Sequence, residues 1–325
     1  MLLLMLLMLR QVLLCIVFMM QVELHLTACG PESYNCHDGT CVTISKRCDK
    51  RNDCPDASDE KNCKLLVTSS SYQAHVAPNT PQHNEKNRIE IHIIILKILN
   101  TQVVENKIKV QFSLSMSWYD SRLMFKNLKA REYYNVLNPK TTELWIPSLG
   151  FHNTEDRQST VSDSNSSITV FKEGNLTLSG LGSLENAEVY RGEDNKIRIT
   201  RNYDINFICN YHLFWFPFDV QTCFMNISIE DQNFLQLVHT GPVTWLGERK
   251  AEEYIFLGTT VTNETFFDGL VGICVEIKFE REIIGAIMTI YIPSTLIVFV
   301  SYLTTIFNNK QWFGHIITIN LTVEQ

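Results

Sequence analysis

The stretch CNYHLFWFPFDVQTC, residues 209–223, decides how the rest of this chain is interpreted. Cys209 and Cys223 enclose thirteen residues, and the run between them is aromatic around Pro217. A loop closed by a disulfide normally faces water, whereas an apolar patch on a surface marks a contact with something else. We therefore expect the aromatic tip to press against another surface, while the disulfide also ties a β-hairpin. Asp219 places one negative charge beside the tip.

The segments on either side of this loop alternate between apolar and polar residues. Apolar side chains occupy every second position from Ile89 to Ile95 and again from Ile108 to Trp118. The runs KIRITRNYDINF (196–207) and VGICVEIKFE (271–280) show the same alternation. A period of two is typical of half-buried strands. About ten such strands without a helical period predict a mainly β chain, with an antiparallel β-sandwich over residues 88–282.

The loop spacing, its Phe-Pro-Phe-Asp core and the flanking strands resemble the signature loop of the pentameric Cys-loop ligand-gated ion channels. Further segments follow the family's order and spacing across the whole β-sandwich: WYDSRL (118–123), LWIPSLGFHN (144–153), IRITR (197–201) and FERE (279–282). The resemblance implies an extracellular domain that binds a small-molecule agonist and assembles with other channel subunits into a pentamer. It does not imply an enzyme, and the sequence has no Gly-rich phosphate loop, nucleophile elbow or zinc-ligand spacing.

In that family, the Cys-loop transmits motion from the ligand-binding domain to the pore. The residues that match its coupling positions are Phe216, Pro217, Asp219 and Arg281, with Glu105 as a weaker candidate in an early turn between strands. An Asp–Arg pair that is partly shielded from water can contribute several times as much as an exposed pair. The Phe216–Pro217 bond is also of the kind that adopts the cis form.

The agonist site departs from the pattern of family members that recognise amines through a box of aromatic rings. Those members usually have an aromatic residue at the positions of Ser113 and Glu230, and an Asp at the position of Ser148. We therefore expect no conventional acetylcholine site, and the agonist stays open. The candidate agonist-site residues are Phe151, His152, Glu230, Phe266 and Phe267. The ion selectivity is also open, because NNKQWFGHI (308–316) has neither the Glu of cation channels nor the Pro-Ala-Arg of anion channels.

Residues 29–63 form a separate cysteine-rich segment. Its cysteines follow the spacing Cys-x6-Cys-x4-Cys-x6-Cys-x5-Cys-x8-Cys. Thirty-five residues cannot bury enough apolar area to fold without additional cross-links. Disulfides are one kind of cross-link. A bound cation is another, since four of the acids between residues 49 and 60 suggest a site and carboxylates are the ligands that calcium prefers. These acids are Asp49, Asp53, Asp59 and Glu60.

The run CDKRNDCPDASDEKNC (48–63) resembles the low-density-lipoprotein-receptor class A repeat. The resemblance implies three disulfides: Cys29–Cys41, Cys36–Cys54 and Cys48–Cys63. It also implies a calcium ion held by the carboxylates of Asp49, Asp53, Asp59 and Glu60 and by the backbone of Lys46 and Arg51. The family usually has Trp at the position of Lys46, where the ring helps to hold a lysine of a protein partner. The usual partner site is therefore in question, and an acidic disulfide knot without metal is the alternative.

The remaining segments predict a secreted and membrane-attached chain. Residues 1–27 are interpreted as a signal peptide, with an uncleaved anchor as the alternative. Residues 64–87 are interpreted as a flexible linker, and residues 283–307 lack charge and are long enough to cross a bilayer. Residues 308–325 are similar to the start of the family's second membrane helix, so we expect the chain to stop short of a complete subunit.

These features place the bulk of the chain outside the plasma membrane. The Asn-x-Ser/Thr acceptors for glycosylation are Asn165, Asn175, Asn226 and Asn263. Cys209 and Cys223 are expected to form a further disulfide. Cys274 is then without a partner cysteine, and we expect it to be a buried free thiol. The net charge of −7 argues against nucleic-acid binding.

The sequence thus supports a subunit of a ligand-gated channel with an extra calcium-binding repeat, which could recruit an extracellular protein partner. The alternative is a membrane-anchored interaction or decoy subunit that uses the repeat without forming a channel. A lipoprotein-uptake receptor would rest on one class A repeat that lacks the usual Trp.

Overall fold

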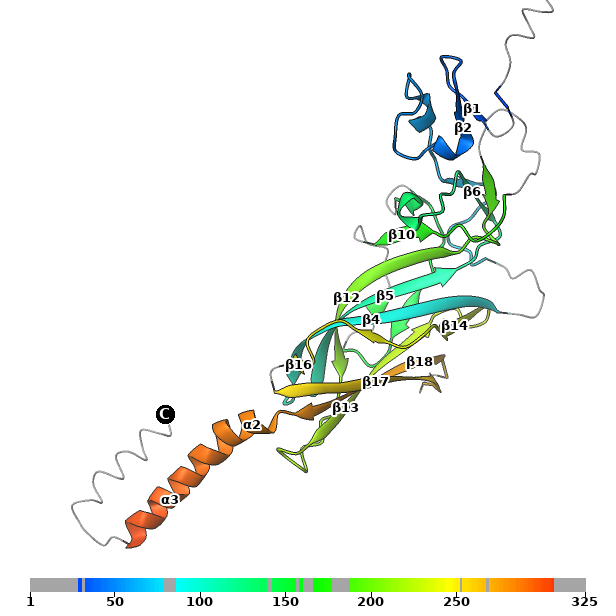
Figure 1. Cartoon of the computed structure of the whole chain (residues 1–325). Helices are drawn as coiled ribbons and strands as arrows, with labels where there is room; N and C mark the ends of the chain where they lie inside the picture. The colour runs from blue at the N-terminus through cyan, green and yellow to red at the C-terminus, as the bar shows by residue number, and fades with distance from the viewer. Residues whose placement is uncertain are drawn as a thin grey trace, which may run out of the picture. The chain divides into compact units, whose positions relative to one another are not determined.

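The structure, a computed structural model, describes most of the chain between residues 29 and 306 (Figure 1). The described residues are 29–30, 33–78, 86–138, 142–155, 158–159, 166–176, 188–251, 253–266 and 269–306. The expected signal peptide, the expected start of a second membrane helix, Asn165 and Phe267 lie outside these ranges. The chain divides into two compact units, each of which is described by itself.

The first unit contains the cysteine-rich segment together with residues 119–138 and 168–198. Its strands and short 3-10 helices are β1 (Ser33–Asn35), β2 (Cys41–Thr43), η1 (Ile44–Lys46), η2 (Ser58–Glu60), β3 (Leu66–Thr68), β6 (Leu123–Lys126), η3 (Glu132–Tyr134), β7 (Val136–Leu137), β10 (Ser167–Val170) and β11 (Val189–Arg191). β1 pairs with β2, and a second small sheet has the order β11-β6-β3, with antiparallel pairing throughout.

The first part of the expected linker is structured, which differs from the flexible tether that its composition predicted. β3 pairs antiparallel with β6, so that Leu66 lies opposite the buried Phe125. Further along, the guanidinium of Arg122 lies 4.8 Å from the ring centroid of Tyr72. The apolar residues of β3 form a strand because a partner strand is available from far along the chain, which composition alone cannot show.

The second unit is the β-sandwich followed by a helix. One sheet has the order β14-β4-β5-β12, and these strands are β4 (Asn87–Gln102), β5 (Lys107–Trp118), β12 (Ile197–Ile208) and β14 (Leu235–His239), with β15 (Thr244–Trp245) also on β4. The other sheet has the order β16-β17-β18-β13-β8-β9, made of β8 (Leu149–Phe151), β9 (Gln158–Ser159), β13 (Val220–Ile229), β16 (Lys250–Ala251), β17 (Tyr254–Thr265) and β18 (Val271–Arg281). β14 and β15 pair with β4 in parallel, because the chain reaches them from β13 in the opposite sheet.

The alternation predicted for the first two strands of the sandwich is confirmed. Every second residue of β4 from Ile89 to Ile95, and of β5 from Ile108 to Trp118, is fully buried. Within this sheet, the ring of Phe112 stacks on Tyr203 with 5.3 Å between centroids, and it meets Phe151 of the opposite sheet edge-on at 5.8 Å. Burial of one such aromatic side chain contributes about 1.5–3 kcal/mol, so this stripe supplies much of the stability of the sandwich.

A continuous helical segment follows directly after β18. It consists of α2 (Ile283–Ala286), a π-helical turn η4 (Ile287–Tyr291) and α3 (Ile292–Ile306) (Figure 1). Residues Ile283–Thr305 form the one helix in the described residues that is long and apolar enough to cross a membrane. Its 23 residues span about 34 Å, against about 30 Å for the hydrocarbon core. The π-helical turn precedes Pro293, whose ring has no N–H and clashes with a carbonyl one turn earlier.

Cys274 provides a test of the packing of the second sheet. Its thiol is free, 2% exposed, and its pKa is raised to about 11, chiefly by burial. At pH 8 about one thiol in a thousand is then ionised, so we expect iodoacetamide to leave Cys274 unmodified in the folded chain. After unfolding in guanidinium chloride without reductant, the same residue should be alkylated fully, as measured by peptide mass spectrometry. Rapid alkylation of the folded chain would contradict this packing.

Candidate functional site

The loop between Cys209 and Cys223 projects an exposed aromatic tip. The two cysteines form a disulfide that joins the end of β12 to β13. Three side chains of the tip are largely exposed: Phe214 by 86%, Trp215 by 71% and Phe218 by 67%. The Phe216–Pro217 peptide bond is cis. This apolar surface, attached to a rigid sheet, is suited to contact with a membrane or with a membrane-embedded partner.

One side of the tip touches the apolar helix. The ring of Phe216 stacks on the ring of Tyr291, with centroids 6.3 Å apart and planes 16° from parallel. The hydroxyl of Tyr291 also donates a hydrogen bond of 3.4 Å to the carbonyl oxygen of Phe216. Tyr291 is the last residue of the π-helical turn. The loop and the helix are therefore in direct contact through one pair of residues.

A buried ion pair anchors the same loop to the strand that leads into the helix. Nε of Arg281 lies 2.8 Å from Oδ1 of Asp219, and the side chains are only 6% and 1% exposed. Gln221 donates to the other carboxylate oxygen of Asp219 at 2.5 Å. Arg281 also pairs with Glu253 at 2.7 Å and donates to the hydroxyl of Tyr254. Since Arg281 ends β18 and the helix begins at residue 283, this pair holds the base of the helix.

The surroundings of this ion pair shift the pKa values of Asp219 and of the neighbouring Tyr254. Burial by itself would raise the pKa of Asp219, but hydrogen bonds from Arg281 and Gln221 outweigh burial and hold that pKa below its ordinary value. A lowered carboxyl pKa means that ionised Asp219 stabilises the fold above the unfolded value of about 3.9, and this stability is lost as the pH falls through the folded value. Burial raises the pKa of Tyr254 to about 12.

Glu105 does not join this cluster. Its carboxylate pairs with Lys107 at 3.3 Å, and Lys107 pairs in turn with Glu155 at 2.8 Å. The turn that carries Glu105 nevertheless contacts the disulfide loop, because the backbone N–H of Cys209 donates to the carbonyl of Asn106 at 2.8 Å. The turn therefore supports the loop through its backbone, and Glu105 lies beside it.

The candidate agonist-site residues do not come together as a box of aromatic rings. Phe151 lies in the core against Tyr203, and is 1% exposed, because its position on β8 faces the opposite sheet. His152 faces the other way, 2.5 Å from the hydroxyl of Ser228 and 5.2 Å from the ring of Phe266. Glu230 is exposed. In the described part of the chain, His152 and Phe266 are thus the two candidates that meet.

A pocket of about 680 Å³ lies at one end of the sandwich, between β14, the start of β4 and the β17–β18 hairpin. Its polar lining includes Lys86, Arg88, Gln232, Gln236 and Asn263. Lys86 donates to the carbonyl of Gln232 at 2.6 Å, and the Gln232 side chain exchanges two hydrogen bonds with the backbone of Val271. The volume is in the range of small-molecule sites, and the charged residues of the lining are cations.

In the cysteine-rich segment, the structure contains the three disulfides that the resemblance implied: Cys29–Cys41, Cys36–Cys54 and Cys48–Cys63. Hydrogen bonds from side chain to backbone link the four acids of this segment in two pairs. Oδ2 of Asp59 accepts from the N–H of Asp53, and Oε1 of Glu60 accepts from the N–H of Asp49, each at 2.7 Å. Asp49 in turn accepts from the N–H of Arg51 at 2.9 Å. Each of these three carboxylates thus uses one oxygen to fix the loop.

One oxygen of this cluster fits a bound cation especially well. Asp59 is fully buried, and its Oδ1 has no hydrogen-bond partner in the structure. A buried carboxylate oxygen without a partner is costly, and a calcium ion would satisfy it. Burial, together with the charges of Asp49 and Asp59, also raises the pKa of Glu60. The donor set and its mutual repulsion therefore fit a divalent cation with oxygen ligands.

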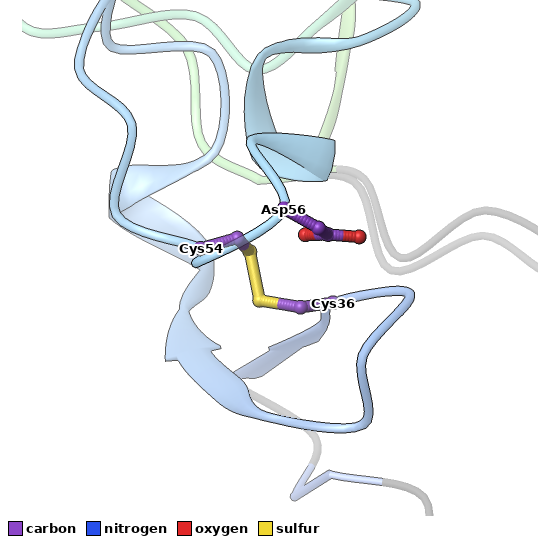
Figure 2. A group of neighbouring side chains, drawn as sticks. All are labelled: Cys36, Cys54 and Asp56. Atoms are coloured by element: carbon purple, nitrogen blue, oxygen red, sulfur yellow. A yellow bond between two sulfur atoms is a disulfide. The ribbon is translucent and has the colours of Figure 1, made fainter.

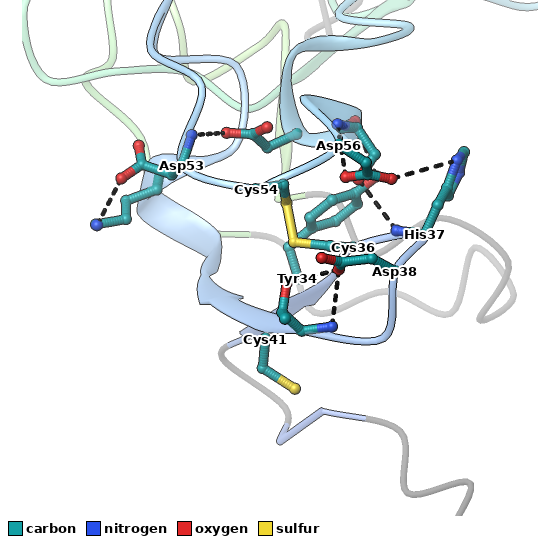
Figure 3. The surroundings of a disulfide bond; sticks show 12 residues. Tyr34, Cys36, His37, Asp38, Cys41, Asp53, Cys54 and Asp56 are labelled. Carbon is teal, nitrogen blue, oxygen red and sulfur yellow. Dashed lines mark hydrogen bonds and ion pairs between the residues drawn. A yellow bond between two sulfur atoms is a disulfide. The ribbon is translucent and has the colours of Figure 1, made fainter.

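A neighbouring group is less suitable for a metal ion. Cys36, Cys54 and Asp56 lie close together (Figure 2), but the two sulfur atoms are bonded to each other and provide no thiolate. Asp56 has other partners: it accepts from the N–H of Ser58 at 3.1 Å and lies 4.0 Å from His37 (Figure 3). This group therefore offers a metal ion one carboxylate that already has other partners, and no thiolate.

Two cations that the sequence did not single out hold the backbone around the acidic cluster. Arg47 donates to the carbonyls of Ser58 and Asp59 at 2.8 and 2.9 Å. Lys129 donates to the carbonyls of Ser45 and Arg47, at 2.6 Å each, on either side of Lys46. Arg47 lies next to the acids in sequence, and this proximity was a weak indication that it holds their backbone. Nothing in the sequence indicated this role for Lys129, since that residue lies more than eighty residues away.

The acceptors for glycosylation differ in exposure. Asn175 and Asn263 are exposed. Asn226 lies within β13, where its side chain is half-buried and its Oδ1 is enclosed. The alternation of the strand places Asn226 on the face opposite the buried Met225 and Ile227, and its glycosylation stays a prediction.

Comparison with known proteins gives two family matches. Residues 59–240 match the neurotransmitter-gated ion-channel ligand binding domain, and residues 27–63 match the low-density lipoprotein receptor domain class A. The serotonin-gated chloride channel mod-1 of Caenorhabditis elegans is 23% identical over 265 residues, covering 78% of this chain and 49% of that channel. The glutamate-gated chloride channel of Drosophila melanogaster is 22% identical over 257 residues, covering 75% of this chain and 52% of that channel. The chain thus spans about half the length of these channels.

The cysteine-rich segment has relatives of a different kind. The human atrial natriuretic peptide-converting enzyme is 51% identical over 35 residues, which are 11% of this chain and 3% of that enzyme. This similarity concerns the repeat alone.

Replacement of Arg281 by Met tests the buried pair. The variant leaves the charge of Asp219 buried without its partner, so we expect a loss of about 3–5 kcal/mol in the free energy of unfolding at pH 7. The loss should shrink as the pH falls and Asp219 becomes protonated. Guanidinium unfolding of the full chain in detergent, followed by tryptophan fluorescence, measures both effects.

The control for this variant is Lys250→Met, which removes the exposed pair with Glu282. That change should cost less than about 1 kcal/mol. Equal losses in the two variants would show that burial of the Arg281 pair has no special effect.

Proposed function

The chain belongs to the neurotransmitter-gated ion-channel family, which is a family of channels and not of enzymes, and we propose that it is a subunit of an extracellular ligand-gated ion channel. The observation that carries the proposal is the contact between the disulfide loop and the apolar helix. Ligand binding in the sandwich can open a pore only if the movement reaches the membrane helix. The stacking of Phe216 on Tyr291 connects the two.

The coupling residues act through two linked contacts. The Asp219–Arg281 pair ties the loop to the last residue of β18, so the base of the sandwich and the start of the helix move together. Phe216 transmits the same displacement to the helix about two turns beyond its start, at Tyr291. The Arg281 guanidinium lies 4.8 Å from the Phe216 ring centroid. Since packed side chains shift between discrete arrangements, a small movement at the loop can favour a different helix position.

The proposed assembly is a pentamer of channel subunits in the plasma membrane, with the sandwich outside the cell. The exposed tip residues Phe214, Trp215 and Phe218 then lie at the level of the lipid headgroups or against neighbouring helices, where amphipathic rings are favoured. The apolar helix Ile283–Thr305 provides the membrane attachment.

We propose that the ligand carries an acidic group. Two features support this: the candidate residues do not form an aromatic box, and the charged lining residues of the pocket at the β17–β18 end are Lys86 and Arg88. A carboxylate would pair with such side chains, whereas a simple amine would be repelled.

We also propose that the class A repeat binds calcium through Asp49, Asp53, Asp59 and Glu60, with the backbone of Lys46 and Arg51. The unpartnered oxygen of Asp59 supports this assignment. A bound ion would neutralise the repulsion within the cluster and cross-link loops that little apolar surface holds together. A repeat ordered in this way would present a surface to an extracellular protein.

A chimaera tests the channel proposal. Residues 1–306 of this chain, joined to the remaining membrane part of the Drosophila glutamate-gated chloride channel, should give ligand-evoked current in oocytes. Among amino acids and biogenic amines, we expect ligands with a carboxylate to be the effective ones. Phe216→Ala should reduce the maximal current by about tenfold or more, because it removes the contact with Tyr291 while the ligand site is unchanged.

The matched control is Phe224→Ala, which removes an exposed ring on β13 outside the disulfide loop. Its current should equal that of the unmodified chimaera. If the chimaera reaches the surface but no ligand evokes current, the membrane-anchored role without a channel is supported instead.

Calcium binding is tested separately by titration calorimetry of the full chain. Asp59→Asn keeps the hydrogen bond to Asp53 but removes the charge, and we expect the calcium affinity to fall by at least about tenfold. Asp59→Ala should also lead to incorrect disulfide pairing among residues 29–63, as read by mass spectrometry. Asp38→Asn is the control, since Asp38 is an exposed acid of the same segment bonded to Thr40. Normal calcium binding by Asp59→Asn would reject the site.

A further inference from the structure

The acidic cluster already contains a cation that belongs to the chain. Nζ of Lys46 lies 2.6 Å from Oδ1 of Asp53. Asp49 and Asp59 also attract this ammonium. Three of the four proposed calcium ligands therefore act on Lys46, whose side chain is half-exposed and free to move away.

The ammonium and a calcium ion compete for the same oxygen atoms. Calcium binds its oxygen ligands at about 2.3–2.6 Å. If Asp53 kept Lys46 and bound calcium through the same oxygen, the two cations would lie within about 5 Å of each other, where like charges repel strongly. Release of the ammonium from Oδ1 of Asp53 relieves this repulsion.

The other contacts of Lys46 show that its backbone and its side chain have separate roles. Lys129 holds the carbonyls of the residues before and after Lys46, which fixes the backbone at the position assigned to a calcium ligand. The ammonium of Lys46, by contrast, bonds a side chain within the described part of the chain, the carboxylate of Asp53. Loss of the Lys46 side chain should therefore leave the backbone ligand in place.

We propose that the Lys46 ammonium is an internal competitor of calcium, which must leave Asp53 before the ion binds and which sets the calcium affinity of this repeat. The inference rests on the proposed calcium site. It makes the repeat a site of moderate affinity, in which the chain's own charge occupies the cluster at low calcium concentrations.

Calcium titration of three full-length chains in detergent tests this directly: the unmodified chain, Lys46→Met and Lys61→Met. Lys61 is the matched control because it is an exposed lysine of the same segment whose ammonium bonds a backbone carbonyl, that of Asp56. Both variants lose one positive charge, but only the first removes the competitor. We expect Lys46→Met to bind calcium about fivefold more tightly than Lys61→Met, and the difference to shrink at high salt.

A second measurement needs no variant. Acetylation of lysines with an N-hydroxysuccinimide ester, read by peptide mass spectrometry, should modify Lys46 at least about twofold faster when calcium chloride is present, because the ion releases the amine from Asp53. Lys61 should be modified at the same rate with and without calcium.

The outcomes separate the two proposals. If the unmodified chain binds calcium but Lys46→Met binds no more tightly than Lys61→Met, the competitor role is rejected and the calcium site stands. If Lys46 is modified equally fast with and without calcium while the ion binds, the competitor role is likewise rejected. If neither the unmodified chain nor Lys46→Met binds calcium, both proposals fail. Binding by Lys46→Met alone would support the competitor role most strongly.

Discussion

Asp219 and Arg281 lie almost out of contact with water, and each charge is stabilised chiefly by the other. Neither residue could be buried alone, because an isolated ion in a protein interior is strongly destabilising. The pair therefore imposes one arrangement on its surroundings: the disulfide loop must sit beside the end of β18. From that position Phe216 reaches Tyr291, and the rest of the aromatic tip stays exposed.

The class A repeat also contains charges that need a partner, but it stabilises them differently. Its four acids lie within one short segment, and two of them, Asp59 and Glu60, accept hydrogen bonds from the backbone of the other two. The positive charges near these acids are side chains of the protein itself. Lys46 pairs with a carboxylate, whereas Arg47 and Lys129 donate to backbone carbonyls. In the sandwich the buried pair is satisfied internally, whereas in the repeat a buried oxygen of Asp59 has no hydrogen-bond partner.

Much of the fold could be predicted from local pattern. The period of two from Ile89 to Ile95 and from Ile108 to Trp118 indicated strands, since alternate residues of a strand face opposite sides. The uncharged run from residue 283 indicated a membrane helix by length alone. The linker was predicted less well, because Leu66–Thr68 forms a strand only where β6 is present to pair with it. Phe151 was named as a candidate for ligand contact, yet it belongs to the core, since the sequence does not show which face of β8 is covered.

The sequence by itself determined the kinds of element, the membrane helix, the positions of the disulfide loop and acidic cluster, and the family that they resemble. These features depend on residues close together along the chain. Only the tertiary structure decided which charges meet: Arg281 with Asp219 across 62 residues, Lys129 with the backbone around Lys46, and the unpartnered oxygen of Asp59. The physical reason is that an ion pair, a buried polar atom and a ring contact depend on distances in space, and folding sets those distances by packing segments that are remote in sequence.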